Sequence, residues 1–487
     1  VTITPADAAD TGPAPTAVTV HPDQTLATVP AGAIGVSEIG NLDGHLHAPG
    51  TDALLDAAGV GLRALDNGAW SDVYRWQTNS FDYDPITAHT TGQNDPGNSW
   101  QAYLGEVRKS GSAALIHVNY GSTATDGPGG SDIGPQEAAA WVRQANLVDH
   151  DNIKYWEIGE EVYGNGFYSS FGAPTWEPDH HADKSPAAYG ANVAKFAQAM
   201  KAVDPSIQIG VGLSMYSGPG VPDWNDPVLT AAGSAVDFVD LHWYEGTTTR
   251  DDSALLQSNR SINTTLDTVR QQITTADGAR ANKVKLIIGE TNVAGANPNR
   301  QSVSTVSALY AADEITSQLE DGASSVDWFA SHVAIQPDAV GAADDPTGVG
   351  YGDYGMLSAG ECGPDALGAQ VCEPKVNTPF PAYYGVTLAS RIATPGARLV
   401  STSVGAGSSV VAHAAVQRNG DLVVLLENQN ADQEQQATID YSGYRVGPVA
   451  EIYSYGQNST SIARRSGRSG SVALPPYSLT ELVLHRG

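Results

Sequence analysis

The stretch that decides the fold reads Tyr155-Trp156-Glu157-Ile158-Gly159-Glu160-Glu161-Val162. A short apolar strand ends at Gly159, and two adjacent carboxylates follow it directly. A second apolar run, Val284 to Ile288, ends in the same way at Gly289-Glu290. Glycosidases that retain stereochemistry use one acid/base carboxyl and one nucleophilic carboxyl roughly 5 Å apart. Acids at the ends of two buried strands favour this chemistry over the alternative, in which they are loop acids that cap helices.

Short β-rich runs alternate with helical patterns from about residue 33 to residue 330. Such alternation is typical of βα units and a parallel sheet. We therefore predict an α/β fold in which eight strands close a (β/α)8 TIM barrel. The predicted strands are Ile34–Glu38, Gly61–Asp66, Ala113–Asn119, Ile153–Gly159, Ile207–Ser214, Val236–Trp243, Val284–Gly289 and Ser325–Phe329.

The pattern changes after a last helical stretch near Pro381–Ile392. From Arg398 to His485, alternating strands are separated by Asn-Gly, Ser-Gly and Gly-Gln-Asn turns, which predicts a C-terminal antiparallel β-sandwich. The strand-like Thr16–Val20 could complete this sandwich. The expected domains are an N-terminal segment over residues 1–30, a catalytic barrel over 31–392 and the sandwich over 393–487.

The composition is strongly acidic. The 487 residues include 54 acids and 25 bases, which gives a net charge of −29. Such a field repels phosphate backbones and anionic lipids, so it argues against nucleic acid or a membrane surface as the partner. No stretch approaches the roughly 18–20 apolar residues of a membrane-spanning helix. A neutral glycan fits the charge better.

The chain begins at Val1 in a Thr/Ala/Pro-rich stretch, which we interpret as a mature amino terminus left after signal-peptide removal. The two cysteines, Cys362 and Cys372, lie in one Gly/Pro-rich loop. A local disulfide is the expected arrangement in an exported protein. We therefore expect a secreted, extracellular protein.

Neither a metal nor a cofactor is expected. Asp179-His180-His181 with Asp183 resembles a metal cluster but lacks regular ligand spacing. The loop acids Asp126 and Asp132 could hold calcium, which stays an open alternative. No Gly-rich phosphate loop follows a predicted strand, so the sequence gives no support for nucleotide chemistry.

Several short motifs spread over nearly the whole chain form a specific set. They are Asn119-Tyr120-Gly121, Glu137-Ala138-Ala139-Ala140-Trp141-Val142, Trp156-Glu157-Ile158-Gly159 with Glu161, Asp240-Leu241-His242-Trp243-Tyr244, Glu290-Thr291-Asn292, Pro381-Ala382-Tyr383-Tyr384-Gly385 and Tyr453-Ser454-Tyr455-Gly456-Gln457-Asn458. With these motifs the chain resembles two-domain glycoside hydrolases of clan A. It is most similar to the arabinofuranosidase-like and xylosidase-like families 51 and 39, and to related bacterial proteins labelled cellulose-binding.

The resemblance implies roles for the strand-end residues. Glu161 would be the acid/base and Glu290 the nucleophile of a double displacement. His242 and Tyr244 would hydrogen-bond to Glu290 and keep it ionised. Arg63 would steady the nucleophile from the second strand.

The chain departs from the family pattern directly before Glu161. Relatives have an Asn there, which touches the sugar 2-hydroxyl, and this chain has Glu160. An amide can donate to a hydroxyl, whereas a carboxylate can only accept from it. A second carboxylate would also raise the pKa of Glu161, which suits a proton donor. Either the sugar presents a different group, or Glu160 is paired with a base such as Arg63.

The end of the second strand, Arg63–Gly68, keeps the family's Arg but differs from the pattern after it, and the end of the first strand is only partly like the family's. The reaction class is therefore better defined than the substrate. Strand ends should supply further substrate contacts, and aromatic side chains should supply platforms on which sugars stack. These remaining expected site residues are Glu38, Asp66, Asn119, Tyr163 and Trp328.

The expected function is a secreted retaining glycoside hydrolase, exo-acting on plant or microbial oligo- or polysaccharide and α-L-arabinofuranosidase-like. One alternative is a clan A enzyme of β-xylosidase, β-galactosidase or β-glucosidase type. Another is a non-catalytic carbohydrate-binding protein on a glycosidase scaffold, which Glu160 and the altered second loop would explain.

Overall fold

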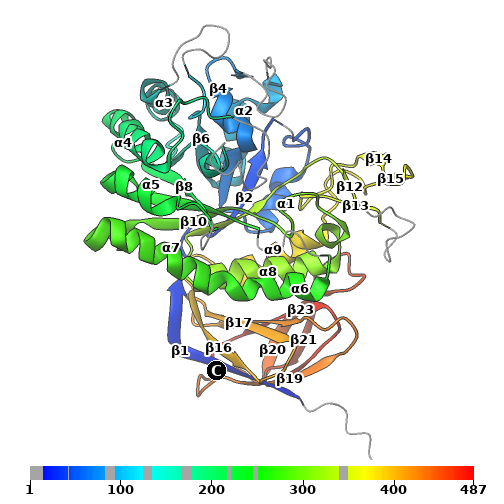
Figure 1. Ribbon diagram of the computed structural model, residues 1–487. Helices are drawn as coiled ribbons and strands as arrows, with labels where there is room; N and C mark the ends of the chain where they lie inside the picture. Colours follow the sequence, from blue (N-terminus) through cyan, green and yellow to red (C-terminus); the bar gives the residue numbers. More distant parts are fainter. Residues whose placement is uncertain are drawn as a thin grey trace, which may run out of the picture. The chain divides into compact units, whose positions relative to one another are not determined.

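The computed structural model describes residues 15–41, 43–82, 94–123, 134–165, 178–216, 221–244, 250–338 and 349–487. The chain forms two compact units (Figure 1). Unit 1 comprises Val1–Leu26 with Ala397–Gly487, and unit 2 comprises Ala27–Gly396. A backbone hydrogen bond of 2.8 Å from Gly396 to Val29 joins the two ends of unit 2.

Unit 2 contains a closed barrel of eight parallel strands, in the order β10-β11-β2-β3-β6-β7-β8-β9. The predicted (β/α)8 barrel is confirmed, and each predicted strand end lies within about two residues of the observed one. The strands are β2 Ile34–Ile39, β3 Leu62–Asp66, β6 Ala113–Val118, β7 Tyr155–Ile158, β8 Gln208–Leu213, β9 Phe238–Trp243, β10 Lys285–Thr291 and β11 Ser325–Phe329.

Helices surround the barrel strands (Figure 1). The start of α4 Pro186–Val203 shows how the sequence begins a helix. The Ser185 side chain accepts from the Ala188 N–H, and Pro186 occupies the first turn. None of the helices in the described ranges is long and apolar enough to cross a membrane. The helices are α1 Thr51–Ala57, α2 Trp100–Ser110, α3 Pro135–Val142, α4 Pro186–Val203, α5 Asn225–Ala232, α6 Asp252–Ser258, α7 Ile262–Asp277, α8 Thr305–Glu320 and α9 Pro381–Ile392.

The barrel interior is apolar toward the amino ends of the strands. Leu62, Ala64, Leu115, Phe238 and Ile287 form one buried cluster there. Because successive side chains of a strand point to opposite faces, the residues between these positions point outward to the helices. This alternation decides which strand residues can reach a substrate.

Unit 1 is one nine-stranded sheet in the order β21-β20-β23-β18-β17-β16-β1-β19-β22. Its first strand, β1 Thr16–Thr28, pairs in parallel with β19, while the other recorded pairings are antiparallel. The remaining strands are β16 Arg398–Val404, β17 Val410–Val416, β18 Leu422–Asn428, β19 Gln435–Asp440, β20 Val449–Gly456, β21 Ala463–Arg468, β22 Ser471–Leu474 and β23 Ser478–Leu484.

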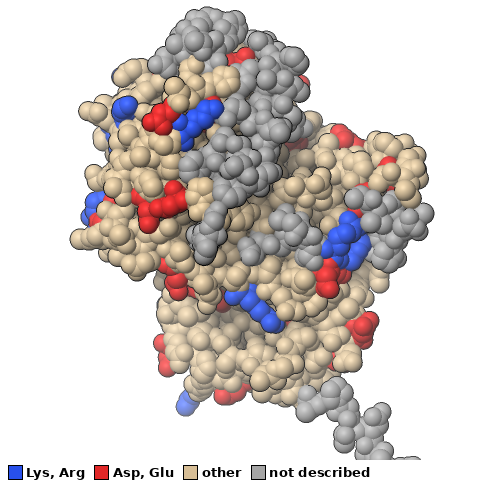
Figure 2. Space-filling model, in the orientation of Figure 1, with Lys and Arg blue, Asp and Glu red and all other residues tan. Residues whose placement is uncertain are grey.

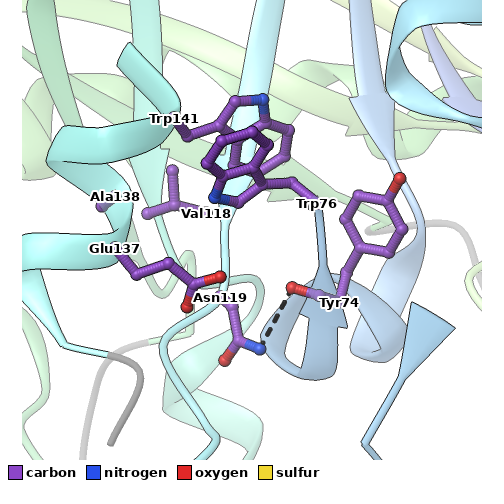
Figure 3. A pocket seen from close by; sticks show the side chains of 7 residues that line it. All are labelled: Tyr74, Trp76, Val118, Asn119, Glu137, Ala138 and Trp141. Carbon is purple, nitrogen blue, oxygen red and sulfur yellow. Dashed lines mark hydrogen bonds between the residues drawn. The ribbon is translucent and has the colours of Figure 1, made fainter. Parts of the chain in front are cut away.

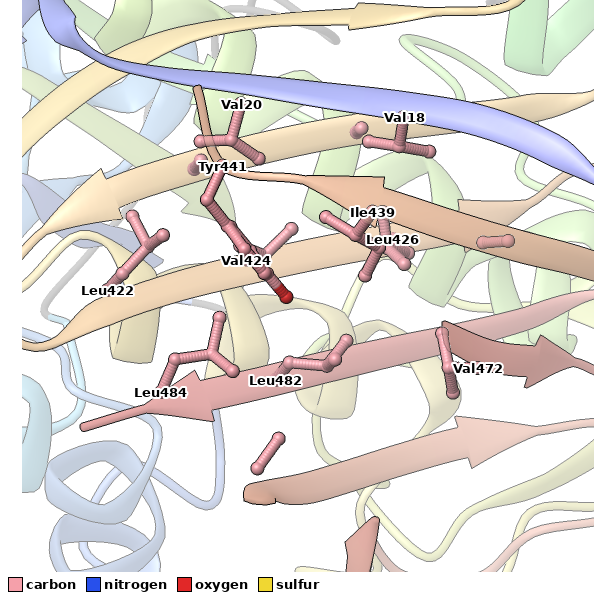
Figure 4. Packing of buried hydrophobic residues seen from close by; sticks show 14 of the residues in the cluster. Val18, Val20, Leu422, Val424, Leu426, Ile439, Tyr441, Val472, Leu482 and Leu484 are labelled. Atoms are coloured by element: carbon pink, nitrogen blue, oxygen red, sulfur yellow. The ribbon is translucent and has the colours of Figure 1, made fainter. Parts of the chain in front are cut away.

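One apolar core holds this sheet together. Val18 and Val20 of β1 meet Val424 of β18, Leu482 of β23 and Val472 of β22 (Figure 4). Since strands from both halves of the sheet order contribute to the same core, the sheet folds over on itself. The predicted C-terminal β-domain with an N-terminal strand is confirmed, apart from the parallel pairing of β1.

A two-stranded hairpin of unit 2 carries the cysteines. β14 Cys362–Pro364 pairs with β15 Gln370–Cys372, and the two cysteines are direct cross-strand partners. They form the predicted disulfide. Two further short pairs are β4 Tyr74–Arg75 with β5 Ser80–Phe81, and β12 Gln336–Pro337 with β13 Tyr351–Gly352.

Candidate active site

A sharp turn after β7 brings Glu160 and Glu161 to the same side of the chain. Gly159 has φ +78°, and a Cβ there would lie within 3.0 Å of Val162, Asp72 and Tyr120, so a glycine is required. Glu161 itself has φ 43°, in the left-handed region. Neighbouring residues of a regular strand would point to opposite faces. The turn lets both carboxylates approach one imidazole.

That imidazole belongs to His242, at the end of β9. Its Nδ1 lies 2.9 Å from Glu161 Oε1, 3.5 Å from Glu290 Oε2 and 3.8 Å from Glu160 Oε1. Because Glu161 Oε1 and Glu290 Oε2 both contact this nitrogen, the distance between these two oxygens cannot exceed the sum of 2.9 and 3.5 Å. That limit is shorter than the roughly 6.5–9.5 Å between the carboxyls of inverting glycosidases.

Glu290 reaches the imidazole because β10 is irregular. The register of β10 against β9 shifts between Ile288 and Glu290, where the Gly289 N–H donates to Asp240 Oδ1 at 2.6 Å. Glu290 is then level with His242. The Tyr244 hydroxyl donates a 2.5 Å hydrogen bond to Glu290 Oε2, as expected.

The two carboxylates differ in exposure. The Glu161 side chain is 32% exposed and that of Glu290 is 8% exposed. Glu161 also accepts a 2.8 Å hydrogen bond from the Tyr163 hydroxyl, so the expected residue Tyr163 lies at the site. Its greater exposure suits Glu161 for exchanging protons with a leaving group or with water.

The pKa shifts of Glu290 and Glu161 differ from the sequence-based expectation. Burial raises the pKa of Glu290 well above its usual value, and Asp66 and Glu161 add to this, although His242 opposes it. Burial would also raise the pKa of Glu161, but hydrogen bonds from His242 and Tyr163 lower it. His242 was expected to keep Glu290 ionised, but its shortest contact is to Glu161. The two carboxyls are thus shifted in opposite directions, and His242 makes its shorter contact with Glu161, the one whose pKa is lowered.

The expected role of Arg63 at the site is wrong. Its Nε and Nη2 donate to both carboxylate oxygens of Glu38 at 2.8 Å, and Nη1 contacts Asp52 at 3.1 Å. Arg63 and Glu38 are fully buried. Since Leu62 and Ala64 face the barrel interior, Arg63 points to the helices and reaches neither Glu160 nor Glu290. Glu38 is its partner there, so the expected substrate contact of Glu38 is also wrong.

Trp328 does not provide a platform for a sugar. It is 1% exposed, and it alternates with Asp327, which faces the barrel interior against Gly35. Trp328 therefore points outward into the packing between barrel and helices. The expectation that it stacks on substrate is wrong for this reason.

Asp66 and Asn119 are buried at the ends of their strands. Asp66 accepts from Ser37 Oγ at 2.9 Å and from the Gly68 N–H at 2.7 Å, and it lies beside Glu290. Asn119 donates to the Tyr74 carbonyl at 3.2 Å (Figure 3). It also exchanges hydrogen bonds with Ser122. The Asn119 amide is thus used in hydrogen bonds to Tyr74 and Ser122, and Asn119 lines a narrow pocket.

That pocket lies beside β6. Figure 3 shows Asn119 and Glu137 facing a tryptophan pair, Trp76 and Trp141, whose rings are stacked at 5.9 Å. Its full lining is Tyr74, Trp76, Val118, Asn119, Glu137, Ala138 and Trp141.

Known proteins resemble parts of the sequence. No protein-family model matches the chain. An intracellular exo-α-(1→5)-L-arabinofuranosidase of Acetivibrio thermocellus is 31% identical over 157 residues, which is 32% of this chain and 27% of that enzyme. Intracellular exo-α-(1→5)-L-arabinofuranosidase 1 of Bacillus subtilis is 26% identical over 192 residues, 33% of this chain and 37% of that enzyme. The chain thus matches about a third of the length of these relatives.

Solved structures resemble nearly the whole fold. The α-L-arabinofuranosidase of Thermotoga maritima has a TM-score of 0.70 at 17% identity, covering 97% of this chain and 100% of that one. The family 51 enzyme of Thermotoga petrophila gives 0.71 at 16%, covering 96% and 100%. The family 44 endoglucanase Cel44A of Clostridium thermocellum gives 0.66 at 14%, covering 97% and 100%.

The chain resembles the arabinofuranosidase-like glycoside hydrolases of clan A. The sequence resemblance covers a third of the chain, and the likeness of fold covers almost all of it. The resemblance expected from the motifs is confirmed.

This arabinofuranosidase-like barrel holds buried polar residues that the sequence analysis did not select. His117, Glu157, Asp240 and Asp327 occupy interior positions of β6, β7, β9 and β11. Each lies on a predicted strand, so strict alternation along those strands could have found them. Asp72 lies in the segment after β3, outside any strand, and had no such signal; its carboxylate accepts from the Glu160 N–H at 3.2 Å.

Some of these atoms lie close together. There are three sets of side chains, and in each the imidazole nitrogen and carboxylate oxygens lie within 4.8 Å of one another. The first set is Asp66, His117 and Glu160, the second is His117, Glu157 and Asp240, and the third is Glu160, His242 and Glu290. Imidazole–carboxylate contacts explain the first and third sets, and a Glu157–Asp240 hydrogen bond explains the second. We assign no metal to them.

The sequence cluster near residue 180 is a local contact. His181 Nδ1 lies 2.7 Å from Asp179 Oδ1, and Asp183 accepts from the Ser185 N–H. Asp126 and Asp132, considered for calcium, lie outside the described residues.

Proposed function

We propose that the chain is a retaining glycoside hydrolase that uses Glu290 as nucleophile and Glu161 as acid/base. One observation carries the proposal: carboxylates from β7 and β10 contact the same nitrogen of His242, at 2.9 and 3.5 Å. This shared contact suits direct attack by one carboxylate, as in retaining glycosidases, whose two carboxyls lie roughly 5–5.5 Å apart.

The first step breaks the glycosidic bond. Glu290 attacks the anomeric carbon while Glu161 transfers a proton to the leaving oxygen, which leaves a glycosyl ester on Glu290. Glu161, now ionised, takes a proton from water, and the resulting hydroxide equivalent releases the sugar and restores Glu290.

The reaction needs Glu290 ionised and Glu161 protonated, which is opposite to the direction of the two pKa shifts. Because His242 contacts both carboxylates, a small shift of its hydrogen bond from Glu161 to Glu290 would stabilise the reactive distribution. A neutral sugar between the carboxylates would favour that shift by displacing water from the more exposed Glu161. The double contact of His242 thus suits a reaction in which charge alternates between two acids.

A neutral, arabinofuranoside-like glycoside cleaved from a chain end is the proposed substrate. The sequence and fold resemblance to arabinofuranosidases supports the sugar, and the acidic interior supports its neutrality. On the face drawn in Figure 2, charged side chains lie scattered among uncharged ones without a continuous basic surface in the described residues. Secretion stays a proposal: the disulfide supports it, whereas the matched relatives are named as intracellular enzymes.

A panel of aryl glycosides tests the proposal. Hydrolysis of at least one neutral glycoside with retained anomeric configuration, observed by NMR and abolished in Glu290→Ala, supports it. A product of inverted configuration contradicts it.

The second candidate is a non-catalytic carbohydrate-binding protein. The raised pKa of the buried Glu290 favours it, because a protonated carboxyl is no nucleophile. Binding of neutral glycans without turnover across the panel would establish this candidate instead.

A further inference from the structure

Glu160 is a buried carboxyl that the proposed reaction does not use. It is 2% exposed, and its Oε2 makes no hydrogen bond to the described residues, although His117 Nδ1 lies 3.1 Å away. Its carboxylate comes within 4.8 Å of the ligand atoms of Glu290 and His242. Any sugar carbon attacked by Glu290 therefore has its substituents within reach of Glu160.

The surroundings of Glu160 hold too few positive groups to neutralise the acids. His242 is shared between Glu161 and Glu290, which leaves the His117 imidazole as the remaining nitrogen contact of Glu160 in the described ranges. The structure records no lysine or arginine contact to Glu160 among the described residues. The titratable groups that face it are Asp66 of β3, Asp72 after β3, His117 of β6, Glu157 of β7, Glu161, His242 of β9 and Glu290 of β10.

We propose that Glu160 is a neutral carboxylic acid that donates a hydrogen bond to a hydroxyl of the sugar beside the anomeric carbon. This inference rests on the proposed hydrolase function. An ionised carboxylate has no hydrogen to donate, whereas a protonated one has a donor and an acceptor. Oε2 is buried against His117 Nδ1, so the proposed donor is Oε1, the oxygen that faces His242 at 3.8 Å.

Physical chemistry favours the neutral form. Burial raises the pKa of Glu160 well above its usual value, and Asp66, Glu290 and Glu161 raise it further. A neutral acid also costs less to bury than a charge without a dedicated partner. The proposal predicts a substrate class: neutral glycosides with a free hydroxyl next to the anomeric carbon, in preference to uronides, whose carboxylate the surrounding acids would repel.

The test compares three side chains at this position. Glu160→Gln keeps a donor of the same shape without a titrating proton, and Glu160→Leu removes hydrogen bonding. We expect kcat/KM to fall less than about tenfold in the Gln variant and at least about 100-fold in the Leu variant. Circular dichroism checks that both fold.

A substrate lacking the hydroxyl provides the matching change in the sugar. Removing this hydroxyl from the sugar should lower kcat/KM of the wild type about as much as Glu160→Leu does. In the Glu160→Leu variant, removing the hydroxyl should have little further effect on kcat/KM. Equal losses in both proteins would show that Glu160 does not contact this hydroxyl.

The pH profile gives a separate readout. A required proton on Glu160 is lost as pH rises through its raised pKa, so Glu160→Gln should move the alkaline limb to higher pH. An ionised Glu160 would instead raise the pKa of Glu161, and its neutralisation would move that limb to lower pH. A downward shift overturns the proposal.

Infrared difference spectroscopy detects the proton without any turnover. Glu160→Gln should remove one protonated-carboxyl band at neutral pH. Glu106→Gln is the control: its carboxylate pairs with Lys109 and its pKa is lowered to about 2, so no band should disappear. If no glycoside is hydrolysed even by the wild type, the proposed function fails, while this band and calorimetric binding of the free sugar still decide the role of Glu160. An unchanged band in Glu160→Gln contradicts the proposal.

Discussion

The Tyr244 hydroxyl lies 2.5 Å from Glu290 Oε2, and Tyr163 holds a similar position toward Glu161 at 2.8 Å. Each candidate catalytic acid thus has its own phenol donor. A donated hydrogen bond stabilises the ionised form of a carboxyl and lowers its pKa. The two tyrosines therefore tune the two acids separately, which allows a matched pair of variants.

Tyr244→Phe should raise the pKa of Glu290, because the ionised form loses its donor. The nucleophile would then ionise only at higher pH, so the acidic limb of kcat/KM should move to higher pH. We expect kcat to fall roughly 10–100-fold. An unchanged acidic limb would separate Tyr244 from the nucleophile.

Tyr163→Phe should act on the opposite limb. Loss of its hydrogen bond raises the pKa of Glu161, so the general acid stays protonated to higher pH and the alkaline limb moves upward. The measurement is again kcat/KM against pH, with Tyr244→Phe as the matched control. A shift of the acidic limb in Tyr163→Phe would mean that the roles of Glu161 and Glu290 are exchanged.

The loss of activity in Glu161→Ala should depend on how strongly the leaving group of the substrate needs a proton. Glycosides with good leaving groups should keep much of their first-step rate, and poor leaving groups should lose about 10²–10⁴-fold. Azide should restore turnover, because a small anion can attack the glycosyl ester without a general base. Equal losses for good and poor leaving groups, with no azide effect, would indicate a structural role.

Arg63→Met tests whether Arg63 is the structural partner of Glu38 or a residue of the active site. It leaves the fully buried Glu38 without its bidentate partner, and breaking a buried pair costs about 3–5 kcal/mol. We expect a large loss in the free energy of unfolding, measured with denaturant, and an unchanged preference among glycosides. A changed preference in a protein of wild-type stability would place Arg63 back at the substrate.

Glu314→Gln should stabilise the protein at neutral pH. Glu314 of α8 is fully buried, and burial raises its pKa well above the ordinary value of 4.5. With a raised folded-state pKa, stability is full below the unfolded value and falls as pH rises through the folded one. The gain in Tm from Glu314→Gln should therefore shrink toward pH 4.5. A gain that is equal at both pH values would contradict the shifted pKa.

Local patterns were sufficient for the barrel. Each strand is a short apolar run of predictable period, so the eight strands and the carboxylates that end two of them could be read from the sequence. The errors at Arg63 and Trp328 concern the face of a strand. Arg63 lies three positions before Asp66, so only one of them can face the interior, whereas the sequence analysis had placed both at the site.

The hydrogen bond of His242 could not be predicted in this way. Its preference for Glu161 depends on the left-handed backbone of Glu161 and on the register shift before Glu290. Both are local departures from regular geometry that no periodic pattern contains. The parallel pairing of β1 with β19 depends likewise on contacts between residues far apart in the sequence.

The position of β1 in its sheet has a consequence for synthesis on the ribosome. β1 is made first, yet its neighbours β16 and β19 are made only after the whole of unit 2. For an unfolded chain, bringing such distant segments together is entropically costly and slow. Once unit 2 has folded, the Gly396–Val29 hydrogen bond holds its two ends together, and the intervening chain acts as a short, closed connection. The barrel is thus the natural first folding unit, and the β-domain is assembled from segments on both sides of it once the last of its strands has been made.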